Sequence, residues 1–155
     1  MNSEYSLYLH IPFCQKRCNY CDFNTYSGIS DLIPEYIKIL CDETKYYGEH
    51  YQSELPVRSI YFGGGTPSLL TIKQMASIFN ILNKFYRIND QAEISLEANP
   101  GTVTLDYLRN LKSVGFNRIS FGVQSTQSKY LQLMGRIHDF YDSINAVFWA
   151  KQAGF

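Results

Sequence analysis

Four segments rich in β-branched and aromatic residues, each followed by apolar residues at helical spacing, constrain the fold of this chain most. They predict strands over residues 6–11, 57–62, 92–97 and 118–123. Strands that alternate with helices are typical of an α/β fold with a parallel sheet, in which each helix is a right-handed crossover. The chain has 155 residues, which is enough for one domain with a hydrophobic core.

The predicted helices follow these strands. They cover about residues 32–47, 71–86 and 104–115, then a short segment ending near residue 134, and a last segment over 139–154. Thr71 and Gln74 have the spacing of a capping box at the start of the second helix. The last helix presents Ile144, Val147 and Phe148 as its apolar face. Each helix is therefore expected to pack one face against the sheet.

Three cysteines fall within eight residues, directly after the first predicted strand. Cys14, Cys18 and Cys21 have the spacing C-x3-C-x2-C, and thiolates at this spacing on a loop can converge on one metal centre. Three thiolates are one fewer than a structural zinc site or a closed [4Fe–4S] cluster uses. In a cluster, one iron would be left open for a small molecule. The alternative is a zinc site with His10 as the fourth ligand. Cys41 lies on the apolar face of a predicted helix and is interpreted as a buried small residue.

Polar or glycine-rich residues follow all four predicted strands. They are residues 14–21, 63–66, 97–99 and Gln124. Because the carboxyl ends of parallel strands meet at one edge, where ligands bind, we expect these four segments to line a single site.

The composition argues against several classes of protein. Acidic and basic residues number 14 each and form no charged block, so nothing favours nucleic acid or an anionic membrane as a partner. No apolar run reaches the roughly 18 residues of a membrane span, and the first residues lack the pattern of a signal peptide. Crowded cysteines suit a reducing compartment better than a disulfide framework. We therefore expect a cytoplasmic protein.

The chain resembles the radical S-adenosylmethionine (SAM) proteins, and more narrowly the oxygen-independent coproporphyrinogen III oxidase-like group. The resemblance covers residues 8–23, 61–68, 93–102, 115–125 and 135–139. The cysteine spacing together with Gly-Gly-Gly-Thr-Pro and Leu-Glu-Ala-Asn-Pro-Gly after later strands is very specific for this group. The resemblance implies a [4Fe–4S] cluster and SAM as cofactors.

Within this group the chain is most similar to the haem chaperone (HemW-like) branch. The oxidase carries a further cysteine where this chain has Phe23, and the sequence Tyr-Cys-Asp-Phe resembles the chaperones. This implies a protein that binds haem, in its full-length form, for transfer to target proteins. One alternative is an oxygen-independent coproporphyrinogen III oxidase of porphyrin biosynthesis. The other is a non-catalytic module whose structure is held together by zinc or an iron–sulfur centre. Coproporphyrinogen dehydrogenase activity is put in doubt by Phe23.

The resemblance also assigns the site residues. Cys14, Cys18 and Cys21 would hold the cluster, and the residues that would contact SAM are Tyr8, Tyr20, Gly64, Gly65, Thr66, Glu97, Gln124 and Arg136. The glycines would line its methionine end, Glu97 would bind the ribose hydroxyls, and Arg136 would pair with its carboxylate. No residue is assigned a catalytic role. His50 and His138 are interpreted as surface histidines rather than haem ligands.

Proteins of this family are more than twice as long and contain six strand–helix units. We therefore expect residues 1–155 to be the N-terminal part of a radical SAM core domain. Its fold would be a parallel-sheet partial TIM barrel of about four units, truncated before the fifth strand, without the C-terminal domain. The fourth strand would then be an unpaired apolar edge, so the chain alone should be poorly soluble or oligomeric. The resemblance implies an electron donor, a haem-receiving protein and peripheral contact with membrane haem proteins as partners.

Overall fold

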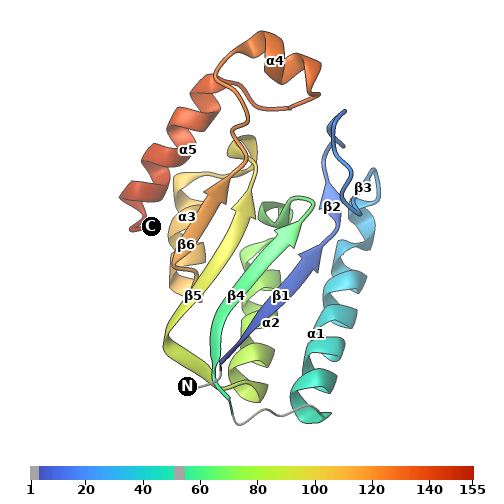
Figure 1. Ribbon diagram of the computed structural model, residues 1–155, viewed down its shortest axis with the longest axis vertical. Helices are drawn as coiled ribbons and strands as arrows, with labels where there is room; N and C mark the ends of the chain where they lie inside the picture. Colours follow the sequence, from blue (N-terminus) through green and yellow to red (C-terminus); the bar gives the residue numbers. More distant parts are fainter. Residues whose placement is uncertain (1–3, 51–54) are drawn as a thin grey trace.

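The computed structural model describes residues 4–50 and 55–155 and contains a four-stranded parallel sheet (Figure 1). The strands lie in the order β1 (Tyr5–Ile11), β4 (Val57–Gly64), β5 (Ile88–Ala98) and β6 (Arg118–Phe121). All three neighbouring pairs are parallel. The predicted α/β architecture with four strands is confirmed. Strand β5 begins four residues earlier than predicted, and β6 ends two residues earlier.

The helices match the predicted ones closely. They are α1 (Ile33–His50), α2 (Ile72–Phe85), α3 (Leu105–Val114), α4 (Ser128–Leu133) and α5 (Phe140–Gln152). Short 3-10 helices cover Ser30–Leu32, Pro67–Leu69 and Pro100–Thr102. The short strands β2 (Phe13–Cys14) and β3 (Tyr26–Ser27) form a small parallel pair of their own. That small pair was not predicted. Over the described ranges, no helix combines the length and the apolar character needed to cross a membrane.

Side-chain caps define where three of the helices begin. The predicted capping box of α2 is confirmed: the Gln74 backbone N–H donates to Thr71 Oγ1 (3.3 Å), and the Thr71 backbone N–H donates to Gln74 Oε1 (2.8 Å). Asp139 and Asp142 form an equivalent pair at α5, and Thr104 caps α3. These bonds satisfy backbone donors that have no partner within the helix.

One face of the sheet is apolar and packs against α1, α2 and α3; in Figure 1, α2 and α3 lie behind the strands and α1 runs beside β1. Side chains alternate between the two faces of a strand, so every second residue points to these helices. The buried set includes Leu9, Ile11, Ile60, Phe62, Leu96, Met75, Ile78, Leu82, Leu108 and Leu111. Each such side chain contributes about 1.5–3 kcal/mol when it is buried. The core therefore fixes the sheet against the helices.

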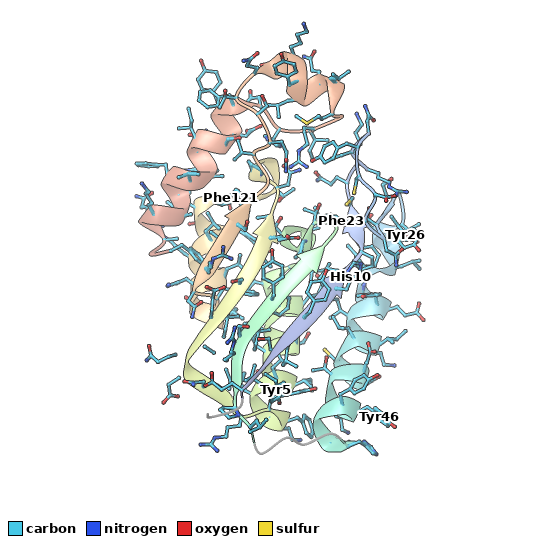
Figure 2. All side chains as sticks on the ribbon, viewed as in Figure 1. Tyr5, His10, Phe23, Tyr26, Tyr46 and Phe121 are labelled. Carbon is cyan, nitrogen blue, oxygen red and sulfur yellow. The ribbon has the colours of Figure 1, made fainter. Side chains whose placement is uncertain are left out.

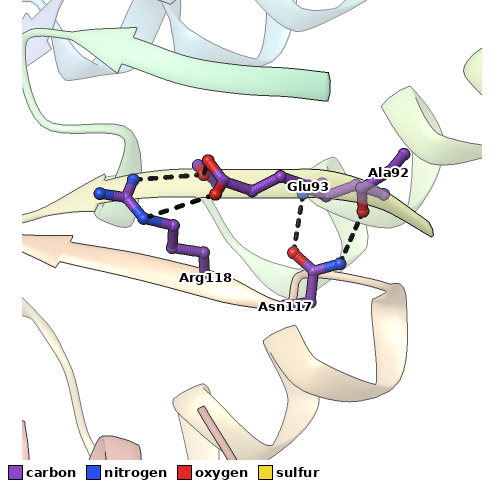
Figure 3. A network of polar contacts seen from close by, with 6 residues as sticks. Ala92, Glu93, Asn117 and Arg118 are labelled. Carbon is purple, nitrogen blue, oxygen red and sulfur yellow. Dashed lines mark hydrogen bonds and ion pairs between the residues drawn. The ribbon is translucent and has the colours of Figure 1, made fainter. Parts of the chain in front are cut away.

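The opposite face of the sheet is polar. Its residues are Ser6, Tyr8 and His10 of β1, Ser59 and Tyr61 of β4, Glu93, Ser95 and Glu97 of β5, and Arg118 and Ser120 of β6. Ser95 Oγ donates to Glu93 Oε1 (2.8 Å), and Arg118 Nε lies 3.8 Å from Glu93 Oε2. Asn117 bonds the backbone of β5 beside this pair, as Figure 3 shows. This face therefore carries a connected polar network rather than a second core.

Helix α5 packs differently from the prediction. Its buried residues are the small Ser143, Ala146 and Ala150, whereas the expected apolar face is exposed. Ile144, Val147 and Phe148 are 47%, 42% and 61% exposed and line an open apolar groove of about 420 Å³. Small residues let the helix approach β6 and α3 closely, so its larger side chains point outward.

Candidate cofactor site

A cavity of about 430 Å³, lined by both polar and apolar residues, opens at the carboxyl ends of the strands. Ten of the eleven predicted site residues line it: Cys14, Cys18, Tyr20, Cys21, Gly64, Gly65, Thr66, Glu97, Gln124 and Arg136. The structure thus brings together the four segments that follow the strands. In Figure 2, Phe23 lies at this end of the molecule, whereas Tyr5 and Tyr46 lie at the other.

The three cysteines of the loop are free thiols with polar neighbours. Thr66 Oγ1 donates to Cys14 Sγ (3.6 Å), Arg136 Nη1 donates to Cys18 Sγ (3.3 Å), and Cys21 Sγ lies 3.9 Å from a threonine hydroxyl. Among the described residues, no three His, Cys, Asp or Glu side chains lie close enough together to hold one metal ion. A [4Fe–4S] cluster spreads its thiolates over separate irons, so its ligands are spaced more widely. Three free thiols line this one cavity, and thiolates are the ligands that hold iron–sulfur clusters.

His10 links the loop that carries the three cysteines (residues 14–24, the cysteine loop) to residues 63–66 (the glycine segment). Its Nε2 donates to the carbonyl of Asn24 (2.9 Å), so its Nδ1 is left to accept from the hydroxyl of Tyr8 (3.0 Å). A Cβ atom on Gly64 would lie 2.7 Å from His10 Cε1, and Gly64 has a φ of +114° that favours glycine. Both ring nitrogens have protein partners, which does not support the zinc alternative with His10 as a ligand.

Tyr8 lies beside the cavity rather than on its wall. It lines a neighbouring pocket of about 310 Å³ between β1 and α1, and its ring stacks on that of Tyr61 at a centroid distance of 6.1 Å. Burial and the negative charge of Glu97 raise the pKa of Tyr8. Tyr8 therefore supports residues of the site through His10 and Tyr61.

The glycine segment forms the end of β4 and continues past it, which extends the pairing of β1 with β4. Gly65 N–H donates to the Ile11 carbonyl (2.8 Å), and Thr66 N–H donates to the Phe13 carbonyl (2.8 Å). A Cβ atom on Gly65 would lie only 2.6 Å from the Phe13 oxygen, so the two backbones can approach this closely only at glycine. The first cysteine and the glycine segment are thereby held side by side.

Glu97 is held by two donors. Its Oε1 accepts from the hydroxyl of Tyr61 (2.7 Å), and its Oε2 accepts from the backbone N–H of Gly64 (3.3 Å). Burial, followed by the hydrogen bond to Glu97, raises the pKa of Tyr61 to about 12, so the phenol stays protonated and donates. Sequence reasoning missed Tyr61. The alternation of side chains along β4 could have indicated it, because Tyr61 lies two residues before Gly63 and therefore on the same face of the sheet.

Arg136 and Gln124 approach the cavity from the segment after β6. Arg136 Nη2 donates to the Gly122 carbonyl, and Nη1 lies 3.5 Å from the hydroxyl of Tyr20. Gln124 has a φ of 64°, the left-handed region that residues other than glycine rarely adopt. Such strain is found where surrounding contacts hold a residue in a functional position.

Comparison with known proteins agrees with this geometry. The sequence model of the Radical SAM superfamily matches residues 8–155. The chain belongs to the radical SAM superfamily. It is 41% identical to the heme chaperone HemW of Haemophilus influenzae over 96% of this chain and 40% of that protein. It is 36% identical to the oxygen-independent coproporphyrinogen III oxidase of Synechocystis over 97% of this chain and 32% of that protein.

A solved structure of this superfamily confirms the predicted partial barrel. Coproporphyrinogen III oxidase (HemN) of Escherichia coli has a TM-score of 0.89 and 30% sequence identity. The similarity covers 98% of this chain and 35% of that one. The chain therefore spans between about a third and two-fifths of the length of the relatives it matches.

The prediction for His138 is wrong, while His50 is exposed as expected. His138 is 4% exposed, and its Nε2 donates to the carbonyl of Val123 (3.1 Å). Burial lowers its pKa, so the ring is neutral. His50 is the last residue of α1, and Cys41 is half-buried with its thiol pKa raised by burial. In this radical SAM chain, His138 thus holds the segment that carries Gln124.

Proposed function

We propose that this chain is the cluster- and SAM-binding part of a haem chaperone-type radical SAM protein. Residues 1–155 would form the N-terminal part of its core domain. The observation that carries the proposal is the gathering of three free cysteines, the glycine segment and Glu97 around one cavity. Relatives named heme chaperone HemW from three bacteria are 36–41% identical to the chain and support this branch.

Different residues would bind the cluster and SAM. Cys14, Cys18 and Cys21 would hold a [4Fe–4S] cluster, which when bound supplies the electron that cleaves a carbon–sulfur bond of SAM. Glu97 has further acceptor capacity on both oxygens, so it would accept hydrogen bonds from the ribose hydroxyls. Tyr61 would keep that carboxylate oriented.

The remaining contacts would come from both walls of the cavity. Gly64, Gly65 and Thr66 would line the methionine end of SAM, where small residues leave room for backbone contacts. Arg136, with a planar fork of donors, would pair with the SAM carboxylate. Tyr20 and Gln124 would add polar contacts, and Tyr8 would act indirectly, through His10 and Tyr61.

The full-length protein would bind haem and pass it to a target protein. Phe23 is 67% exposed on the cavity wall and supplies no fourth thiol there, which favours the chaperone over the oxidase. The protein would act in the cytoplasm, take electrons from a donor protein, and touch membrane haem proteins peripherally. No nucleic acid is expected as a partner.

Anaerobic reconstitution of the chain tests the site. We expect a brown protein with about four irons and four sulfides per chain, and an electron paramagnetic resonance (EPR) signal that changes when SAM is added. Cys14→Ser, Cys18→Ser and Cys21→Ser should each prevent cluster assembly. Cys41→Ser is the matched control and should assemble normally. A colourless protein that retains zinc would refute the proposal.

The second candidate function is an oxygen-independent coproporphyrinogen III oxidase. The Synechocystis oxidase, 36% identical over 97% of this chain, favours it. Haem titration and coproporphyrinogen conversion, both measured with the full-length protein, separate the two. Conversion of coproporphyrinogen without stable haem binding would establish the oxidase instead.

A further inference from the structure

The cysteine loop is tied to a segment more than a hundred residues away. Asn19, between the second and third cysteines, bonds the end of α4 twice. Its backbone N–H donates to the Met134 carbonyl (3.0 Å), and its Nδ2 donates to the Leu133 carbonyl (2.8 Å). Figure 1 shows α4 and the β2–β3 loop at the same end of the molecule.

The neighbours of Asn19 are held by the same segment. Arg136 Nη1 lies 3.3 Å from Cys18 Sγ and 3.5 Å from the hydroxyl of Tyr20. Gly135 has a φ of +73°, and a Cβ atom there would lie 3.0 Å from Asn19 Oδ1. Residues 133–136 therefore contact three consecutive positions of the cysteine loop.

Other contacts hold the two ends of the loop, where Thr66 bonds Cys14 and His10 bonds the Asn24 carbonyl, but few hold its middle. Residues 15–17, 19, 20 and 22–24 are exposed, so they gain little from burial. Among the described residues, the hydrogen bonds that join residues 15–23 to distant segments are those made by Asn19 and Arg136. The other bonds of this stretch are local, such as Cys21 N–H to the Cys18 carbonyl. An exposed loop with few contacts opens easily unless specific bonds restrain it.

We propose that Asn19 and residues 133–136 form a clasp that holds the cysteine loop in its cluster-binding conformation. This rests on the proposed function of the site. Asn19 is a positioning residue: it is not among the residues that line the cavity, and it orders the backbone between Cys18 and Cys21. Ordering these residues before binding reduces the conformational entropy that cluster assembly would otherwise cost.

Hydrogen–deuterium exchange of the cluster-free chain tests the clasp directly. Asn19→Ala removes the side-chain bond and keeps the backbone N–H. Since one hydrogen bond is lost, we expect exchange in residues 14–23 to be about 3- to 10-fold faster. Exchange in β4 and α2 should stay unchanged. Asn110→Ala is the matched control, because Asn110 Nδ2 also donates to a carbonyl at 2.8 Å, but within α3.

The reconstituted protein gives the second readout. Asn19→Ala should lose its cluster absorbance to an iron chelator several-fold faster than the wild type, and Asn110→Ala should not. Gly135→Ala places a Cβ atom against Asn19 and should speed both hydrogen exchange and cluster loss in the same way. It replaces Asn19→Ala in both experiments if that variant does not fold. Unchanged exchange in residues 14–23, or equal acceleration in every peptide, would overturn the clasp. If the wild type assembles no cluster, the proposed function fails while the exchange result still decides the clasp.

Discussion

Replacing Gly65 by alanine should separate the glycine segment from the cysteine loop. The added Cβ would lie 2.6 Å from the Phe13 oxygen and 3.0 Å from the Ile11 oxygen. Both are backbone atoms, and they accept the hydrogen bonds of Thr66 N–H and Gly65 N–H. The overlap therefore cannot be relieved by a side-chain rotation. The two strand ends must move apart.

The expected cost follows from these contacts. Overpacking costs about 1–3 kcal/mol, and each weakened hydrogen bond adds about 0.5–1.5 kcal/mol. A loss of about 3 kcal/mol lowers the urea midpoint of unfolding by about 1.5 M if the denaturant slope is about 2 kcal/mol/M. SAM binding to the reconstituted chain should weaken as well, because Gly64, Gly65 and Thr66 share one cavity with the cysteines.

Urea unfolding followed by circular dichroism, and equilibrium binding of SAM, measure the two effects. Gly101→Ala is the control, since a Cβ atom there meets nothing nearer than 3.3 Å. It should shift the midpoint much less. If Gly65→Ala unfolds at the wild-type midpoint and binds SAM normally, the close approach of these backbones is not needed for the site.

Three further predictions follow from burial and charge. Because burial and the bond to Glu97 raise the pKa of Tyr61 from 10 to about 12, its contribution to stability is complete below pH 10 and is lost as the pH rises toward 12. Tyr61→Phe should make the urea midpoint depend less on pH over this range, and an unchanged alkaline profile would contradict the raised pKa of Tyr61. Because burial lowers the pKa of His138 below 6.5, stability should be complete above pH 6.5 and fall as the pH drops further; His138→Gln should remove this part of the acid dependence. The exposed apolar face of α5 should make the 155-residue chain self-associate. The double variant Val147→Lys, Phe148→Glu should therefore have a lower mass by light scattering than the wild type, and a monomeric wild type would refute this.

Four side chains of the candidate cofactor site contact one another. Tyr8, His10, Tyr61 and Glu97 are linked across β1, β4 and β5 by hydrogen bonds and ring stacking. Each of the four therefore has a protein partner within this set. This arrangement keeps the Glu97 carboxylate and the glycine segment in place before any ligand binds.

Local sequence patterns determined the elements and the edge at which the site lies. Residues 71–74 carry their own capping bonds, and alternation along residues 6–11 separates an apolar from a polar face. Both are short-range effects of backbone geometry and side-chain chemistry, so they can be predicted without a partner segment. The position of polar residues after parallel strands then placed the cysteines, the glycines and Glu97 together.

Only the tertiary structure decided which side chains support that site. Tyr61 meets Glu97 across 36 residues, and Asn19 meets Leu133 across 114. His138 is buried by neighbours that its own sequence context does not reveal, and α5 packs through alanines instead of its larger apolar residues. Such contacts depend on the register of strands and the fit of helices, which are set by packing of the whole chain rather than by local propensity.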